Sequence, residues 1–271
     1  MTRLVWDQAG DRVYENGVSQ GVFYGSDSKG IPWNGLISVD EINNSSVDPL
    51  YFDGFKYADL VTIGDFEGRI RAYTYPDEFL DYEGIDDWKP GFYLADQTKD
   101  RFGLSYRTEI SSDQGSQIGY KIHLLYNLIA VPSDKRYQTL SLDSEPMEFE
   151  WDISAIPEQI DRFRPTAHVV IDSRKMDPFL LTDIEAIIYG NEEKEPLLPE
   201  LNGFITFVQK WGRFIVVDNG DGTWTATSPL EGVITMLDEE TFQIDTDTAV
   251  YIDSESYTLS SSEADEGSIW P

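Results

Sequence analysis

Carboxylates are the side chains that this sequence offers most abundantly for chemistry. The chain of 271 residues carries 50 acidic and 20 basic side chains. Glu148 and Glu150 fall on the same face of an alternating stretch, which places them about 7 Å apart by the two-residue repeat of a strand. That separation suits an inverting glycosidase. Such pairs also arise by chance throughout an acidic, strand-rich chain, so we expect no enzyme activity.

The two histidines, His123 and His168, are the other candidates for catalysis or metal binding. Two histidines do not make a three-histidine zinc site, and no HExxH motif is present. Each is predicted to be a hydrogen-bonded histidine of a sheet rather than a catalytic base. The absence of cysteine excludes disulfides and cysteine-rich zinc sites. We therefore expect no metal and no cofactor.

A calcium loop is the remaining possibility, at Asp218–Gly222 (DNGDG). An EF-hand loop needs oxygen ligands at its positions 1, 3 and 5. Glycines, Gly220 and Gly222, occupy the third and fifth positions here. A hairpin turn is favoured over a calcium site.

The formal net charge of −30 bounds the function further. Such a chain should not bind nucleic acid through its phosphates. The charge is typical either of a soluble protein from an acidic, salt-tolerant proteome or of a surface that must lie near polyanions without binding them. No apolar run approaches the roughly 20 residues of a membrane helix. The first residues show no secretory signal, so synthesis in the cytoplasm is expected.

The stretch Arg69–Phe79 (RIRAYTYPDEF) indicates how the sheet is built. Ile70 and Ala72 alternate with Arg69 and Arg71, which predicts a strand with one apolar face. Pro76 lacks a ladder donor, so the strand should end near Tyr75. No nucleophile, metal spacing or phosphate cradle lies in this stretch, and its predicted role is assembly.

The surrounding chain is predicted to be mostly strands. Asp40–Pro49 is polar without periodicity and should be a loop, and Pro76–Gly91 should be irregular up to a turn at Pro90-Gly91. The strands expected between residues 51 and 171 are Tyr51–Ile63 with a turn or bulge at Asp53-Gly54, Arg101–Ser111, a central strand Gly119–Val131, Pro146–Ile153 and Val169–Ile171. In Pro146–Ile153, Glu148 and Glu150 share a face with Asp152, which predicts a wet, negative surface.

One helix is predicted, over Pro178–Tyr189. Asp177 is a suitable N-cap, Pro178 suits the first helical position, and Gly190 follows as the C′ residue. Residues 191–202 should form a linker. Beyond it, the expected strands are Phe204–Gln209, Arg213–Val217, Thr223–Thr227, Val233–Leu237, Phe242–Ile244 and Tyr251–Tyr257. The chain therefore divides into a domain of residues 1–199 and a small β-rich module of residues 200–271 with a loose tail.

Seven short stretches in this order carry a resemblance to a known family. They are Ile31–Gly35 (IPWNG), Asp48–Tyr57 (DPLYFDGFKY), Ala72–Phe79 (AYTYPDEF), Arg101–Thr108 (RFGLSYRT), Tyr120–His123 (YKIH), Val170–Ser173 (VIDS) and Ile188–Gly190 (IYG). Residues 1–199 resemble the major tail tube protein of long, non-contractile-tailed (siphovirus-type) bacteriophages, particularly those of actinobacterial hosts. Residues 200–271, with GDGTWTA at Gly220–Ala226, are similar to a small β module appended to such tail proteins.

The resemblance implies a mainly β fold, an antiparallel β-sandwich or barrel of the phage tail tube type with one flanking α-helix, plus a small C-terminal all-β domain. It also implies a structural virion protein of the phage tail. Six copies would form a ring, and rings would stack helically into the tube that delivers DNA to the host. Its partners would be further copies of itself and the terminator, distal tail and tape measure proteins. DNA would pass along an acidic lumen during ejection without specific binding.

Candidate site residues follow from this expectation. Within the predicted loop, Asp40, Glu41 and Asp48 are candidates for contacts between rings. Tyr73, Tyr75 and Phe79 are candidates for subunit packing. Glu148 and Glu150 are candidates for the lumen surface, because a wall of carboxylates repels duplex phosphates and lets DNA slide.

Two alternatives stay open at this point. The first is a minor tail component, a terminator or distal-tail ring, which stops at one ring. The second is a β-sandwich module that binds carbohydrate or the host surface. Exposed aromatic side chains would support the second, and Trp211, Trp224 and Trp270 are its candidates, although packing of Trp224 in a small sheet is favoured.

Overall fold

The computed structural model describes residues 6–10, 12–42, 44–137, 139, 146–192 and 194–211, and the backbone of residues 215–218, 224–227, 233–236, 241–245 and 267–268. The chain forms two compact units, which are treated separately. The first comprises Met1–Met176 and Ile184–Leu201, and the second comprises Asp177–Asp183 and Asn202–Pro271.

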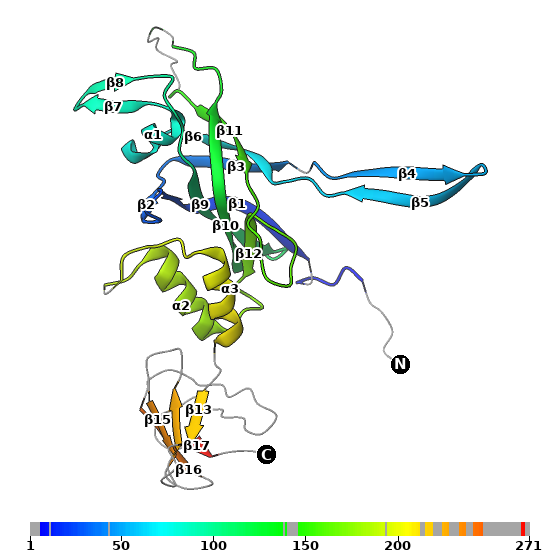
Figure 1. The fold of residues 1–271 in the computed structure, drawn as a ribbon, viewed down its shortest axis with the longest axis vertical. Coiled ribbons are helices and arrows are strands. Elements are labelled where there is room, and N and C mark those ends of the chain that lie inside the picture. Colours follow the sequence, from blue (N-terminus) through cyan, green and yellow to red (C-terminus); the bar gives the residue numbers. More distant parts are fainter. Residues whose placement is uncertain are drawn as a thin grey trace. The chain divides into compact units, whose positions relative to one another are not determined.

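An eight-stranded antiparallel sheet dominates the first unit (Figure 1). Its order is β2-β1-β9-β10-β11-β6-β3, and β12 also pairs with β10. The strands are β1 (Val13–Tyr24), β2 (Gly30–Pro32), β3 (Leu36–Ile42), β6 (Glu67–Ala72), β9 (Phe102–Ser112), β10 (Gln117–Pro132), β11 (Phe149–Ala155) and β12 (His168–Asp172). The predicted mainly β, antiparallel sandwich class is confirmed, with no closed barrel in the described part of the chain. The predicted central position of the strand at Gly119–Val131 is also confirmed, since β10 has neighbours on both sides.

The core of this unit is aromatic. Phe79 and Trp151 are fully buried, and their rings meet edge to face with centroids 5.3 Å apart. Ile70 and Ala72 of β6 are buried in the same cluster, while Arg69 and Arg71 are partly exposed. The predicted alternation of this strand is therefore confirmed.

The end of β6 differs from the prediction, because the strand stops at Ala72 rather than near Tyr75. The residues that follow β6 form hydrogen bonds with the segment around the turn at Asn34-Gly35. The Tyr73 amide donates to the Gly35 carbonyl at 2.8 Å, and the Trp33 indole donates to the Thr74 carbonyl at 2.9 Å. These bonds replace the ladder partners that β6 would need to continue.

The stretch expected to be irregular between Pro76 and Gly91 is ordered. It contains a 3-10 turn at Asp77–Phe79, the short helix α1 (Leu80–Glu83) and strand β7 (Asp86–Lys89), which pairs with β8 (Phe92–Leu94). Burial of Phe79 and Tyr82 in the aromatic core accounts for the order of the first part. The predicted turn at Pro90-Gly91 is confirmed, since it joins β7 to β8.

The loop predicted at Asp40–Pro49 is wrong. Asp40 and Glu41 lie in β3, and Asp48 lies in β4 (Ser46–Phe52). Strand β4 pairs with β5 (Phe55–Thr62) in a separate two-stranded hairpin that extends far from the main sheet (Figure 1). The predicted turn at Asp53-Gly54 forms its tip. We call β4 and β5 the arm.

Helix α2 (Pro178–Tyr189) is confirmed with the predicted bounds. Asp177 caps it, because its Oδ1 accepts the backbone amides of Phe179 at 2.9 Å and Leu180 at 3.3 Å. Gly190 has a φ of +75°, as a left-handed C′ residue requires. The expectation of a single helix is wrong, because α1 and α3 are also present in the described part of the chain.

Helix α3 (Leu201–Lys210) replaces the strand expected at Phe204–Gln209. The burial pattern of this segment has the period of a helix rather than that of a strand. Leu201 and Phe204 are buried at a spacing of three, while residues 203 and 206 are exposed. The Thr206 hydroxyl donates to the Asn202 carbonyl one turn earlier, at 2.8 Å.

The second unit also contains a five-stranded antiparallel sheet in the order β13-β14-β15-β16-β17. Its strands are β13 (Ile215–Asp218), β14 (Trp224–Thr227), β15 (Val233–Met236), β16 (Thr241–Asp245) and β17 (Gly267–Ser268). These bounds confirm the four predicted strands between residues 213 and 244 to within a few residues. The strand predicted at Tyr251–Tyr257, four residues of the DNGDG stretch and Trp270 lie outside the described residues.

Candidate functional site

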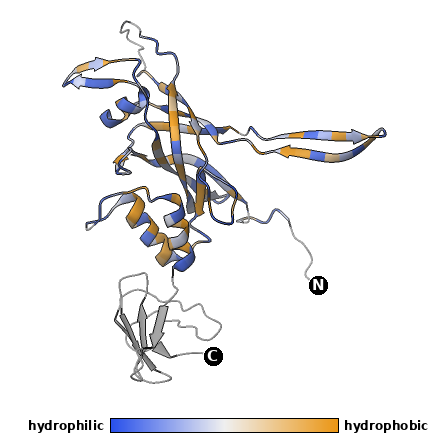
Figure 2. Cartoon of the chain, in the orientation of Figure 1, coloured by the Kyte–Doolittle hydropathy of each residue, from blue (hydrophilic) through white to orange (hydrophobic). Residues whose placement is uncertain are grey.

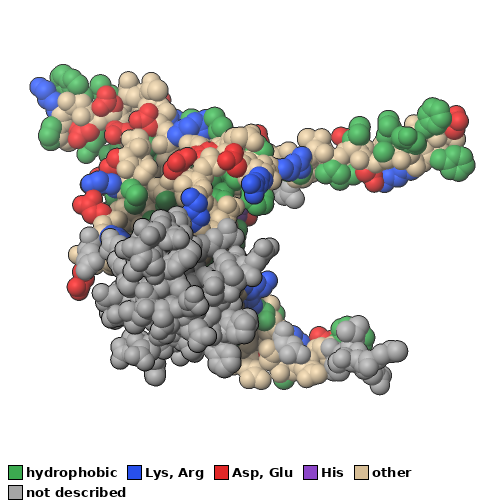
Figure 3. Space-filling view, turned by 60° about the horizontal axis from the view of Figure 1, so that its bottom comes forward, with side chains coloured by type: hydrophobic (Ala, Val, Ile, Leu, Met, Phe, Trp, Pro, Cys, Tyr) green, Lys and Arg blue, Asp and Glu red, His purple; other side chains and the backbone are tan. Residues whose placement is uncertain are grey.

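Among the described residues of the first unit, the arm carries the largest group of exposed, large apolar side chains. Every residue of β4 is exposed, and so is nearly all of β5. Its large side chains include Phe52, Phe55 and Tyr57, which are 69%, 79% and 75% exposed. Figure 2 shows hydrophobic and hydrophilic residues interspersed along both strands, and Figure 3 shows hydrophobic side chains gathered towards the tip.

Few side-chain contacts hold the arm within the part of the chain that the structure describes. The rings of Phe52 and Tyr57 meet edge to face at 6.4 Å, and Lys56 and Asp59 form an ion pair at 2.6 Å. A two-stranded hairpin without a packed face is only marginally stable in water. The arm is therefore expected to be only marginally stable by itself.

A shorter hairpin, β7–β8, projects from a different part of the first unit (Figure 1). Trp88, Phe92 and Tyr93 on it are more than half exposed. Lys89 lies over the Trp88 ring at 4.7 Å. The first unit thus presents two exposed aromatic hairpins.

The structure places the three predicted packing residues differently from one another. Phe79 is fully buried in its own chain and offers no surface. Tyr75 is partly buried, with its ring 5.0 Å from Phe149 and 5.4 Å from Trp151, and burial raises the pKa of its phenol. Tyr73 is 46% exposed and is the one of the three that is free to meet a neighbour.

The face expected to be negative at Glu148–Asp152 carries both signs of charge. Arg69 pairs with Asp152 at 2.8 Å and with Glu150 at 3.3 Å. On the other side of β6, Arg71 pairs with Asp40 of β3 at 3.0 Å. The charges alternate across β11, β6 and β3, so Glu150 is not a bare carboxylate. Glu148 precedes β11 and is exposed.

Glu41, the second residue of the predicted loop, takes part in a group that the sequence did not reveal. Glu41 of β3, His123 of β10 and His168 of β12 converge at one end of the core. His123 Nδ1 lies 3.1 Å from His168 Nε2 and 3.4 Å from Glu41 Oε1. The distance from His168 Nε2 to Glu41 Oε1 is 3.9 Å. We call these three residues the His–Glu cluster.

Neighbouring side chains fix the orientation of the cluster. The Tyr106 ring stacks on His123 with centroids 4.6 Å apart, and its hydroxyl donates to Glu41 Oε1 at 2.7 Å. Burial and this hydrogen bond raise the pKa of Tyr106, so the phenol stays a donor. The Phe66 ring lies 5.3 Å from His168, and burial lowers the pKa of His168 towards a neutral imidazole.

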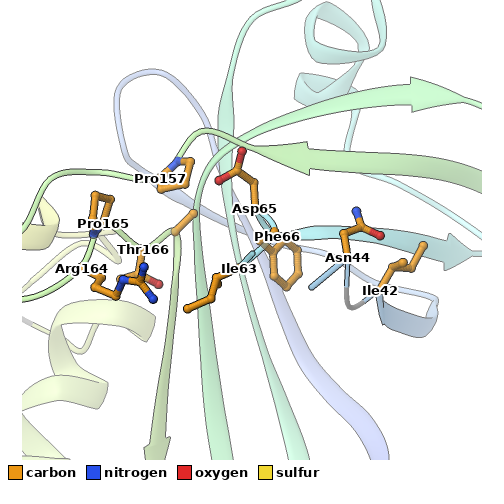
Figure 4. A pocket seen from close by; sticks show the side chains of 11 residues that line it. Ile42, Asn44, Ile63, Asp65, Phe66, Pro157, Arg164, Pro165 and Thr166 are labelled. Atoms are coloured by element: carbon orange, nitrogen blue, oxygen red, sulfur yellow. The ribbon is translucent and has the colours of Figure 1, made fainter. Parts of the chain in front are cut away.

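A cavity of about 390 Å³ lies beside this cluster, where the arm leaves the sheet (Figure 4). Its walls come from the two sides of the arm's root, with Ile42 and Asn44 on one side and residues 63–66 on the other, and from Pro157 and residues 164–167 just before His168. Apolar groups dominate, and Arg164 and Asp65 supply its charges. The residues that line this cavity include no nucleophile paired with a base.

Sequence reasoning missed the His–Glu cluster because no local spacing signals it. His123 and His168 meet only through the register of β10 and β12, which pairs Leu125 with His168. The prediction that both are hydrogen-bonded sheet histidines agrees with their contacts. In the second unit, the Trp211 indole donates to Asp183 at 3.0 Å, and the side chain of Trp224 lies outside the described residues.

No helix among the described residues has the length and apolar character that crossing a membrane requires. No family model and no curated protein matches the chain. One solved structure that is similar is the PVC sheath/tube terminator of an extracellular contractile injection system in its extended state. The match has a TM-score of 0.29 and 15% sequence identity, and it covers 58% of this chain and 97% of the other. At this identity and score it does not assign the chain to that protein's family or function.

Proposed function

We propose that this chain is a structural subunit of a bacteriophage tail, which assembles as hexameric rings stacked into the tube through which DNA passes to the host. The resemblance of residues 1–199 to siphovirus major tail proteins is the starting point. The antiparallel sheet and the exposed hairpins support a role in assembly. The subunit works by contact alone, without catalysis or a cofactor.

The arm is the observation that carries this proposal. Its exposed aromatic side chains and its lack of a packed face are costly for an isolated chain. A second copy of this chain is the partner that removes that cost at every position of a ring or stack. The arm replaces the predicted loop as the contact between rings, and of the predicted contact residues Asp48 lies on it.

The edges of the large sheet support the same assembly. Strands β2 and β3 end the path of the sheet, and unpaired edge strands are normally paired, covered or blunted in stable proteins. Pairing of such edges between neighbouring subunits would complete a continuous inner wall. We place the partners terminator, distal tail and tape measure at the ends and in the lumen of this tube, in the virion tail.

The charge of the chain suits a conduit for DNA. A net charge of −30 repels duplex phosphates, so that DNA slides rather than adheres. Of the two predicted lumen acids, Glu148 is the stronger candidate, because Glu150 is paired with Arg69. Residues 200–271 would form a module on the exterior of the tube.

Electron microscopy of the full chain, alone and with the other tail proteins, tests the proposal. The wild-type chain should form rings or tubes. In the phage particle, a tube subunit should be present in dozens to hundreds of copies. The double variant Phe52→Ser/Phe55→Ser should stay monomeric. Phe163→Ser is the matched control, because Phe163 is 61% exposed but lies outside the arm.

The outcomes separate the alternatives. About six copies per virion would replace the tube subunit with a terminator or distal-tail ring. If the wild-type chain stayed monomeric under every assembly condition, the proposed assembly would be overturned. If the Phe52→Ser/Phe55→Ser variant formed tubes as well as the wild type, the proposed role of the arm would be overturned.

A further inference from the structure

The spacing of ligand atoms in the His–Glu cluster is that of a metal site. Ligands about 2.1 Å from a tetrahedral zinc ion are on the order of 3.4 Å from one another. The three separations here are 3.1, 3.4 and 3.9 Å. A single ion placed between these atoms would reach all three with small side-chain movements.

The hydrogen bonds around His123 leave the lone pair of its Nδ1 directed at the other two residues of the cluster. The Thr108 hydroxyl donates its one proton to Glu15 Oε1 at 2.6 Å, because an ionised carboxylate only accepts. Thr108 must then accept at its 3.1 Å contact with His123 Nε2. In the neutral imidazole the proton therefore sits on Nε2, and Nδ1 presents its lone pair to His168 and Glu41.

These contacts are the kind that support metal ligands. A histidine that binds a metal through one ring nitrogen usually donates a hydrogen bond from the N–H of the other to an oxygen acceptor, which fixes the tautomer and the ring orientation. Thr108 and Glu15 provide this for His123, and Lys121 in turn pairs with Glu15. Glu41 is held from the other side, where its Oε1 accepts a hydrogen bond from the Tyr106 hydroxyl.

The His–Glu cluster is also accessible to an ion from solvent. The side chains of His123 and His168 are 8% and 17% exposed, whereas that of Glu41 is 44% exposed. The imidazoles are thus held by packing, and the carboxylate side is open to solvent. An ion could enter there, and a water molecule could complete its coordination.

We propose that Glu41, His123 and His168 bind one divalent transition-metal ion, with zinc as the preferred ion. Two imidazoles and one carboxylate with an open fourth position form a known ligand set for zinc. The zinc ion would link β3, at the root of the arm, to β10 and β12. The site is structural and requires no catalytic step.

Zinc binding by the full-length protein tests this. The chain is stripped with a chelator and titrated with Zn²⁺ in excess Mg²⁺, which occupies the carboxylates of the surface. One ion per chain should bind, and the thermal midpoint should rise. Co²⁺ in place of Zn²⁺ should give the intense visible absorption of a tetrahedral complex.

Two variants and one control locate the ion. His168→Gln and Glu41→Gln should each weaken zinc binding at least about 10-fold, the scale on which even supporting residues act, and should abolish the rise in thermal midpoint. Glu67→Gln changes a carboxylate of the neighbouring strand and should bind zinc as the wild type does. Circular dichroism without metal shows whether each variant is folded.

Two results would overturn the inference. In the first, the folded wild-type chain takes up no zinc in excess Mg²⁺, so that the cluster is a hydrogen-bonded histidine pair only. In the second, zinc binds equally well to His168→Gln and Glu41→Gln, which would place the ion elsewhere on the acidic surface.

Discussion

His123 Nδ1 faces His168 Nε2 at 3.1 Å, although 45 residues separate the two histidines in the chain. Strands β10 and β12 make this meeting possible, because their antiparallel register places His168 beside Leu125, two residues from His123. The same face carries Tyr106 on β9. The end of the core is thus polar and hydrogen-bonded, while its middle is aromatic.

Hydrogen exchange should distinguish the arm from the sheet. Amides of β4 and β5 should exchange fast in the monomer, because few buried contacts hold them. Amides of β10, which is paired on both sides, should exchange slowly. Assembly should protect the arm by at least about 10-fold if it packs on a neighbour. Equal protection of the arm in monomers and assemblies, measured by mass spectrometry, would contradict this.

Truncation of the aromatic residues near the end of β6 should separate a folding role from a surface role. Phe79→Ala should lower the free energy of unfolding by about 3–5 kcal/mol, because it leaves a cavity against Trp151. Tyr73→Ala should change it by no more than about 1 kcal/mol, since 46% of Tyr73 is exposed. Urea denaturation of the monomer measures both. A Tyr73 variant that folds normally but no longer assembles would show that this side chain packs between subunits.

The ion pairs of Arg69 should contribute little to stability. Both partners, Glu150 and Asp152, are substantially exposed, and such pairs are worth at most about 1 kcal/mol. Arg69→Gln should therefore lower the free energy of unfolding by less than about 1 kcal/mol, and added salt should reduce the difference. A larger loss that persists in high salt would mean that the pair is more deeply buried than the structure shows.

The stability of the first unit should fall with acid through Asp172. The Arg174 side chain donates to both carboxylate oxygens of Asp172, at 3.0 and 2.7 Å, and lowers the pKa of Asp172 to about 2. The unfolded state binds the proton at a higher pH, near 3.9, so this contribution is present above about pH 5 and is lost as the pH falls towards 2.

Arg174→Gln should flatten that dependence. Chemical denaturation of the wild type and the variant at several values between pH 5 and pH 3 measures the slopes. The difference between the two proteins should shrink as the pH falls. A constant difference across the range would show that Arg174 acts by packing rather than through the charge of Asp172.

Prediction from sequence succeeded where the signal was local. Asp177, Pro178 and Gly190 mark the two ends of α2, and the apolar run around Leu124 marks β10 as central. The turn of the arm and its strand β5 were predicted within Tyr51–Ile63, whereas most of β4 was missed. A hairpin that is solvent-exposed on both faces needs no alternation of apolar and polar residues, so Asp40–Pro49 resembles a loop. Helix α3 was missed because its few apolar residues fit either period over a short length.

The candidate site was harder to predict than the fold. Burial of Phe79 depends on α1 folding back into the aromatic core, and pairing of Glu150 with Arg69 depends on the register of β11 and β6. The convergence of Glu41 with the two histidines depends on three strands that are distant in sequence. None of these relations leaves a pattern along the chain.

The arm continues the pair β3–β6, and this determines how a mechanical load would enter the subunit. Ile42 at the end of β3 pairs with Glu67 at the start of β6, so both strands of the arm emerge from neighbouring strands of one sheet. A pull along the arm acts parallel to those strands and loads the ladder between β6 and β11 in shear. Its hydrogen bonds then share the force together instead of opening one after another, so the root of the arm should resist tension far better than its tip.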